Sequence, residues 1–104
     1  MEKKEIQKHI DFLKSKILSE TSGQTRLFRE GKNAKIRKSA EKNLDYAVQR
    51  ANKYLDDNPD LFDFMVDYHG CAPENLEYPD YAHIEKDTRV YIDALSKMLE
   101  NTEN

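Results

Sequence analysis

Residues 33–57 read NAKIRKSAEKNLDYAVQRANKYLDD and contain the clearest helical pattern of the chain. Apolar side chains recur there at spacings of three and four, which places them along one stripe of an α-helix. The stripe consists of Ile36, Ala40, Leu44, Ala47, Val48, Ala51 and Leu55. Asn33 is a good N-cap, and Pro59 stops the helix because it lacks a backbone donor. We therefore expect a long amphipathic helix over residues 33–57.

The same periodicity predicts a long helix on each side of this one. The first covers about residues 2–19, and its stripe consists of Ile6, Ile10, Leu13 and Ile17. The second covers about residues 80–100, with a stripe that runs from Tyr81 to Leu99. Pro79 and Asp80 are favourable residues for the start of that helix.

Two shorter segments complete the helical prediction. Residues 59–68, PDLFDFMVDY, are apolar around most of the helical circumference, so we expect a short, mostly buried helix that ends at Gly70. Residues 25–30 could form one further helical turn. No segment alternates with a period of two, which argues against a sheet. The expected fold is an all-α bundle, a single helical domain over residues 1–104, with three long amphipathic helices and one short buried helix.

Size and composition limit the possible functions. A chain of 104 residues is too small to enclose a large substrate cavity. It has no Gly-rich phosphate loop and no CxxC pair, so we expect no cofactor and no enzymatic activity. No apolar run approaches the ~18 residues that a membrane-spanning helix needs, and one cysteine cannot form an internal disulfide. We expect a cytoplasmic protein without a membrane partner.

Charge divides the chain into two opposite halves. Residues 1–54 carry 14 Lys or Arg against 7 Asp or Glu, a net charge of +7, whereas residues 55–104 carry 3 against 13, a net charge of −10. The two values sum to the net charge of −3. Part of this division could be internal complementarity between neighbouring helices, which stabilises exposed pairs only slightly.

The acidic half is the favoured binding surface. Its carboxylates are interleaved with aromatic side chains, and such a field attracts basic partners. The candidate residues are Asp56, Asp57, Asp60, Asp63, Phe64, Asp67, Tyr68, Glu74 and Glu77. The alternative is an acidic rim that only keeps the domain in solution.

The basic half suggests a second binding mode. On a helix over residues 33–57, several lysines fall in one sector opposite the apolar stripe, and a basic helical face can neutralise phosphates. The candidate residues for nucleic-acid binding are Arg26, Arg29, Lys32, Lys35, Lys38, Lys42 and Lys53. The acidic residues Glu41 and Asp45 interrupt this face, and no established nucleic-acid-binding motif is present.

The stretch YHGCAPENLEYPDYAH, residues 68–83, raises the question of a metal or thiol site. His69, Cys71 and His83 are possible ligands, although their spacing lacks the paired halves of structural zinc sites. As a nucleophile, Cys71 would follow a helix C-terminus, whose dipole disfavours a thiolate. The alternative is a proline-stiffened connector between two helices.

Three functional classes remain open from the sequence. The favoured one is a small non-enzymatic interaction protein, such as an inhibitor, an immunity factor or a regulatory subunit, that binds a partner protein with a basic surface. The second is a nucleic-acid-binding helical module that uses residues 33–57. The third is a metal or thiol protein that uses His69, Cys71 and His83. A homo-oligomer is compatible with the first class.

Overall fold

The computed structural model describes residues 1–102 and is helical over most of them, with no strand in this range. The elements are α1 (Lys3–Phe12), η1 (Leu13–Leu18), α2 (Ser19–Thr21), α3 (Gln24–Glu30), α4 (Ala34–Asp57), α5 (Pro59–His69), η2 (Pro73–Asn75) and α6 (Ile84–Asn101). The molecule is elongated, with principal extents of 51 × 26 × 20 Å. These observations confirm the predicted all-α helical bundle.

The first long helix is continuous from α1 through η1 to α2, but its middle part, η1, has π-helical hydrogen bonding. The hydroxyls of Ser15 and Ser19 donate to the carbonyls of Asp11 and Ser15, at 2.6 and 2.5 Å. Such bonds compete with the backbone N–H groups for the same carbonyls, which explains the loosened register. The predicted stripe still faces the core, because Ile6, Ile10, Leu13 and Ile17 are all buried.

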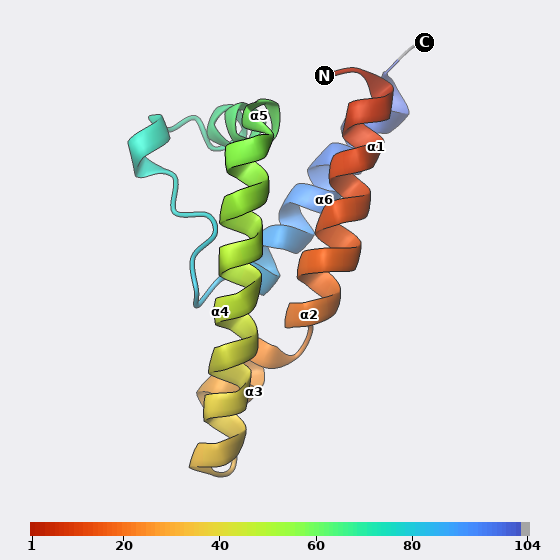
Figure 1. The fold of residues 1–104 in the computed structure, drawn as a ribbon. Helices are drawn as coiled ribbons and strands as arrows, with labels where there is room; N and C mark the ends of the chain where they lie inside the picture. Colours follow the sequence, from red (N-terminus) through yellow and green to blue (C-terminus); the bar gives the residue numbers. More distant parts are fainter. Residues whose placement is uncertain (103–104) are drawn as a thin grey trace.

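A tight turn reverses the chain between α3 and α4, and the two helices form a hairpin at one end of the molecule (Figure 1). Asn33 is the N-cap of α4, as predicted, and its side chain accepts a hydrogen bond from the Ile36 N–H at 2.9 Å. Gly31 is required before it, because a Cβ there would lie 2.4 Å from the Leu27 carbonyl oxygen.

Helix α4 is the longest element and supplies one wall of the core. Its buried residues are Ala40, Leu44, Ala47, Ala51 and Leu55. Ile36, the first member of the predicted stripe, is instead 37% exposed, because the hairpin extends beyond the bundle. At the other end, Asn58 and Pro59 separate α4 from α5, which lies across the end of α4 (Figure 1). Helix α5 buries Leu61, Met65 and Val66 and leaves Asp63 and Asp67 exposed.

Helix α6 returns through the bundle and packs against α1 and η1. It begins at Ile84 and not near residue 80 as the sequence predicted. The reason is that residues 80–83 form a separate turn, in which the His83 N–H donates to the Asp80 carbonyl at 3.0 Å. The expected stripe is otherwise present, since Ile84, Tyr91 and Leu95 are buried. Among the helices of residues 1–102, none contains an apolar stretch of the length that spans a bilayer.

Candidate partner-binding surface

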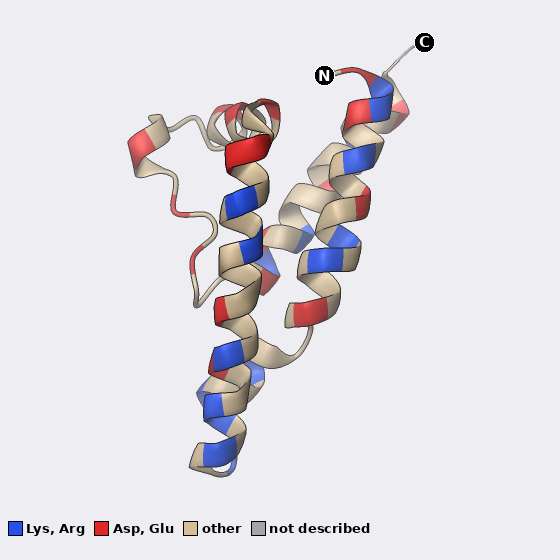
Figure 2. Ribbon diagram, viewed as in Figure 1, with Lys and Arg blue, Asp and Glu red and all other residues tan. Residues whose placement is uncertain are grey.

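Two clusters of opposite charge lie at the two ends of the longest helix. Lys and Arg gather around α3 and the start of α4, whereas Asp and Glu gather around the end of α4, α5 and the loop that follows (Figure 2). Helix α1 carries both signs. We call the two regions the basic tip, residues 26–42, and the acidic end, residues 55–78. Internal neutralisation between these regions is therefore small, because their separation exceeds the screening length of about 10 Å at moderate salt.

Most of the predicted carboxylates of the acidic end are exposed. Asp63 and Asp67 lie on the outer side of α5, because Leu61, Met65 and Val66 occupy its inner side. The other exposed members are Asp56, Asp57, Glu74 and Glu77. None of these six side chains makes an ion pair with another residue of the range 1–102. Their charges are available to a partner.

Asp60 differs from the other carboxylates, because it takes part in a contact within the bundle. Its Oδ2 lies 2.8 Å from Nε2 of His9, which is 1% exposed in the wall of the core. Burial alone would raise the pKa of Asp60, but the hydrogen bond and charge of His9 outweigh it and lower this pKa. Asp60 is therefore part of a structural contact between α1 and α5.

The second nitrogen of His9 extends this contact to α4. Nδ1 lies 2.7 Å from the Tyr54 hydroxyl, and the Tyr54 ring stacks on Phe12 at a centroid distance of 3.7 Å. Burial, and then the charge of Asp60, raises the pKa of Tyr54 to about 12, so the hydroxyl stays protonated. The sequence prediction did not include His9. His9 follows Ile6 by three residues and directly precedes Ile10, so it lies beside the apolar stripe. This position was the sequence signal that His9 is buried.

The aromatic candidates of α5 have different environments. Tyr68 is 51% exposed, and its ring contacts Phe64, His69 and Tyr91 at centroid distances of 6.2, 5.2 and 6.2 Å. Phe64 is half-buried against the core. Tyr68 is thus the aromatic side chain of this surface that a partner can reach most readily.

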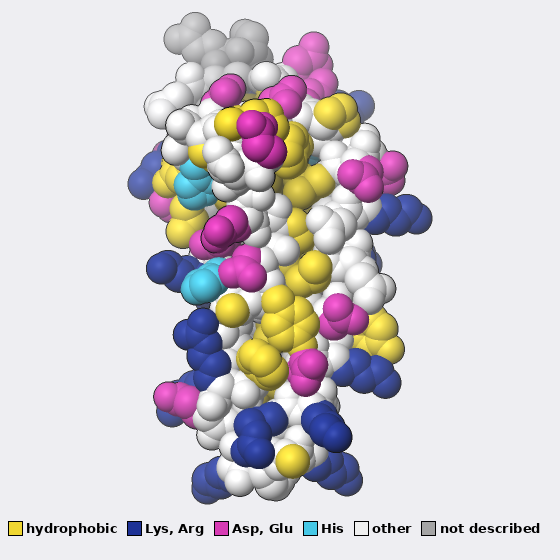
Figure 3. All heavy atoms as spheres, turned by 90° about the vertical axis from the view of Figure 1, so that its left-hand side faces the viewer, with side chains coloured by type: hydrophobic (Ala, Val, Ile, Leu, Met, Phe, Trp, Pro, Cys, Tyr) yellow, Lys and Arg dark blue, Asp and Glu magenta, His cyan; other side chains and the backbone are white. Residues whose placement is uncertain are grey.

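An apolar pocket of about 320 Å³ opens at the acidic end, between the end of α4, the start of α5 and the loop. Its lining residues are Asn52, Leu55, Asp56, Pro59, Phe62 and Tyr78. Figure 3 views this side of the molecule, with acidic side chains around hydrophobic ones in its upper part and Lys and Arg gathered at the opposite end. An apolar hollow with a charged rim is the usual arrangement of a protein-binding hot spot.

A second pocket, of about 230 Å³, lies on the other side of Tyr78, between the loop and α6. Its lining residues are His69, Cys71, Asn75, Leu76, Glu77, Tyr78, Asp87 and Tyr91. Nε2 of His69 lies 2.7 Å from the Tyr91 hydroxyl, and the Tyr78 hydroxyl lies 3.1 Å from Oγ1 of Thr88. Both tyrosine rings are buried and held in place by these bonds.

The metal candidates do not converge. His69 and Cys71 line the same pocket, but His83 lies at the start of α6, where its Nδ1 bonds to the Asp80 carboxylate. Across residues 1–102, no group of three or more His, Cys, Asp or Glu side chains is arranged to hold a metal ion. His83 therefore does not join His69 and Cys71 in one group, because the turn at residues 80–83 holds it to Asp80.

The basic tip contains most of the predicted nucleic-acid-binding residues. Lys32, Lys35, Lys38 and Lys42 are exposed and form no ion pair with any residue that the structure describes. The arginines are partly engaged, since Arg26 pairs with Glu30 at 3.2 Å and Arg29 donates to the Ala82 carbonyl at 3.3 Å. Lys53 is not part of the tip, because it lies eleven residues or about 16 Å beyond Lys42 along α4.

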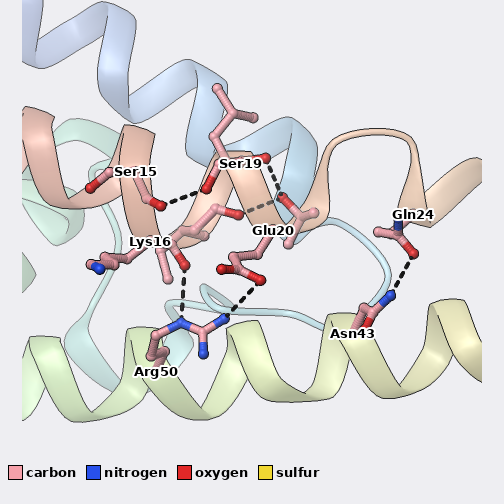
Figure 4. Close-up of polar contacts among 10 residues, drawn as sticks. Ser15, Lys16, Ser19, Glu20, Gln24, Asn43 and Arg50 are labelled. Atoms are coloured by element: carbon pink, nitrogen blue, oxygen red, sulfur yellow. Dashed lines mark hydrogen bonds and ion pairs between the residues drawn. The ribbon is translucent and has the colours of Figure 1, made fainter.

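Another arginine of α4 has an internal role. Arg50 donates from Nε to the Lys16 carbonyl at 3.0 Å, and its Nη2 lies 3.7 Å from the Glu20 carboxylate (Figure 4). Nearer the start of α4, Asn43 donates to the Gln24 side chain at 3.1 Å. These contacts join α4 to the first long helix and to α3, so Arg50 is not available to a ligand.

No protein-family model matches this chain, and neither a curated protein nor a solved structure matches it.

Proposed function

We propose that this chain is a small non-enzymatic binding protein whose acidic end docks onto a basic surface of a partner protein. It acts as an inhibitor, an immunity factor or a regulatory subunit, because covering a charged site on a partner is enough to block or modulate it. We place this activity in the cytoplasm, where a lone cysteine stays reduced.

The observation that carries the proposal is the apolar pocket at the acidic end, which has Asp56 in its lining and further unpaired carboxylates on the adjoining helix. Leu55, Pro59 and Phe62 supply apolar surface that a partner side chain can bury. Asp56 lies at the same pocket, and Asp63 and Asp67 are exposed on the adjoining helix. A solvated acidic rim needs no such hollow, so the pocket favours a binding role over the alternative of charge that only keeps the domain in solution.

The two features contribute differently to binding. Exposed carboxylates act at long range and raise the association rate with a basic partner, by a factor that falls as salt rises. Burial of apolar surface in the pocket slows dissociation, since most affinity differences between related complexes lie in the dissociation rate. Tyr68 adds an exposed aromatic ring, a residue type that is frequent in binding hot spots.

The test is affinity capture from host extract with three tagged proteins. They are the wild type, the double variant Asp63→Asn/Asp67→Asn, and a control variant Asp45→Asn/Asp93→Asn. The control removes the same charge from exposed positions outside the acidic end. We expect one protein with a basic surface to be retained by the wild type and the control but not by the acidic-end variant. Equal retention by all three proteins contradicts the proposal.

A second candidate function is binding of nucleic acid at the basic tip. The observation that favours it is the group of exposed lysines without ion pairs, Lys32, Lys35, Lys38 and Lys42. Phosphate contacts of this kind give an affinity that falls steeply with salt. Loss of the captured material after nuclease treatment, together with retention by the acidic-end variant, would replace the first candidate with this one.

A further inference from the structure

The pocket between the loop and α6 has a composition that differs from the apolar pocket on the other side of Tyr78. Its lining includes two carboxylates, Glu77 and Asp87, and no Lys or Arg. Within residues 1–102, neither carboxylate side chain makes an ion pair or a hydrogen bond. The pocket therefore carries negative charge that the described part of the chain does not neutralise.

Aromatic rings form the inner wall of this pocket. The Tyr78 and Tyr91 rings meet at 77° with a centroid distance of 4.8 Å, and the His69 ring meets Tyr91 at 90° and 5.5 Å. Burial, and then the charge of nearby Asp87, raises the pKa of Tyr91, which keeps its hydroxyl protonated. Tyr78 is 6% exposed and Tyr91 is 1% exposed, so the two rings give the pocket a rigid apolar wall.

The end of α5 adds to the preference for a cation. His69 is the last residue of this eleven-residue helix, and Cys71 follows the Gly70 cap. The C-terminus of a helix carries a partial negative charge, which favours positive groups nearby. The carboxylates and the helix C-terminus therefore act in the same direction.

We propose that this pocket is a socket for one arginine side chain of the partner protein, which refines the function proposed above and rests on it. A volume of about 230 Å³ is smaller than the roughly 300 Å³ at which small-molecule sites begin, so it suits a single side chain. The planar guanidinium can donate its N–H groups to the carboxylates of Asp87 and Glu77, while its alkyl stem lies against the apolar lining of the pocket.

The socket is tested with N-acetylarginine amide, a small mimic of the side chain, and with N-acetylcitrulline amide as its neutral isostere. Amide chemical shifts of the isotope-labelled full chain are followed during titration at neutral pH. We expect saturable shifts at Cys71, Tyr78 and Tyr91 with the arginine compound and binding at least about fivefold weaker with the citrulline compound. Equal binding of both compounds, or no saturable shift with either, overturns the socket.

Two variants locate the binding site. Asp87→Asn removes a socket carboxylate, and we expect it to weaken binding of the arginine compound about fivefold. Asp93→Asn removes a carboxylate from the outer side of the same helix, where it pairs with Lys97 at 3.1 Å, and we expect it to leave binding unchanged. If Asp87→Asn is poorly folded, Glu77→Gln in the loop takes its place. Unchanged binding in the socket variant overturns the assignment.

The outcome is separable from that of the proposed function. If Asp63→Asn/Asp67→Asn loses the captured partner but Asp87→Asn keeps it with wild-type affinity, the socket is wrong and the acidic-end proposal stands. If the arginine compound binds as expected but no partner depends on Asp63 and Asp67, the socket stands as a cation site and the proposed function is wrong.

Discussion

Nε2 of His9 in α1 lies 2.8 Å from Oδ2 of Asp60 in α5. The two residues are 51 positions apart in the chain, and their contact joins the two helices. His9 is 1% exposed, and its other ring nitrogen bonds to the Tyr54 hydroxyl. Both polar atoms of a buried imidazole are therefore satisfied by side chains from α4 and α5. The contact fixes the position of α5, the helix that carries Asp63 and Asp67 of the acidic end.

Replacing His9 should destabilise the fold more than an ordinary surface change. His9→Ala leaves a cavity and removes the partners of Tyr54 and Asp60, and we expect a loss of about 3 kcal/mol in the free energy of unfolding. Gln7→Ala, on the exposed side of the same helix, should cost less than about 0.5 kcal/mol. Urea denaturation of both variants measures the difference. A cost for His9→Ala no larger than that of Gln7→Ala would contradict a stabilising role of the contact.

The same contact predicts a specific pH dependence of stability. Because the folded state lowers the pKa of Asp60 below its ordinary value of 3.8, ionised Asp60 stabilises the fold above that pH, and this contribution is lost as the pH falls through the folded pKa. Asp60→Asn lacks the contribution at every pH. We therefore expect the stability difference between wild type and Asp60→Asn to be present above pH 3.8 and to shrink as the pH falls below it.

Denaturant titrations at neutral pH and at about pH 3 measure this difference. Asp63→Asn is the control, since Asp63 is exposed on the same helix and makes no ion pair with a described residue. Its stability difference from wild type should change little between the two conditions. A difference for Asp60→Asn that stays constant or grows on acidification would contradict the prediction.

Cys71 should be dispensable. It is half-buried in the loop pocket. Among residues 1–102, it belongs to no group of three or more side chains that could hold a metal ion. Cys71→Ser should lower the free energy of unfolding by less than about 1 kcal/mol and leave partner capture unchanged. Thermal unfolding and the capture assay measure both effects. Stoichiometric zinc in wild-type protein purified without chelator would contradict this prediction.

The lysines of the basic tip should not contribute to folding. Lys35, Lys38 and Lys42 are exposed on α4 and lie opposite its buried residues. Changing all three to Glu should keep the helical content measured by circular dichroism, with a change in unfolding free energy within about 1 kcal/mol. The corresponding Gln variant separates the loss of positive charge from the gain of negative charge. Loss of helicity in both variants would show that this side of α4 is covered.

Periodicity was sufficient to predict the helices, because one buried stripe per helix dominates the packing of a small bundle. The predicted first residue of a helix was less accurate where local hydrogen bonds determine it. Asp80 looked like a helix start, but the turn it makes with His83 delays α6 to Ile84. Ile36 looked like a core residue, but it is 37% exposed at the hairpin tip.

The candidate surface was predictable only in part. The charge division along the chain indicated the acidic end, and Asp63 and Asp67 are exposed as expected. The sequence could not separate Asp60 from these neighbours, because its partner His9 comes from a distant segment. The pockets on both sides of Tyr78 likewise depend on how the loop folds back on α4 and α6, which no local pattern encodes.

The central claim is that the acidic end attracts a basic partner, and the association rate is its most direct measure. Stopped-flow association with the captured partner should be compared at low and near-physiological salt for the wild type and for Asp63→Asn/Asp67→Asn. We predict that the wild-type rate falls steeply with salt, and that the variant associates about tenfold more slowly at low salt with a flatter dependence. An unchanged rate with the same salt dependence in the variant would contradict the claim and leave these aspartates as solvating charge.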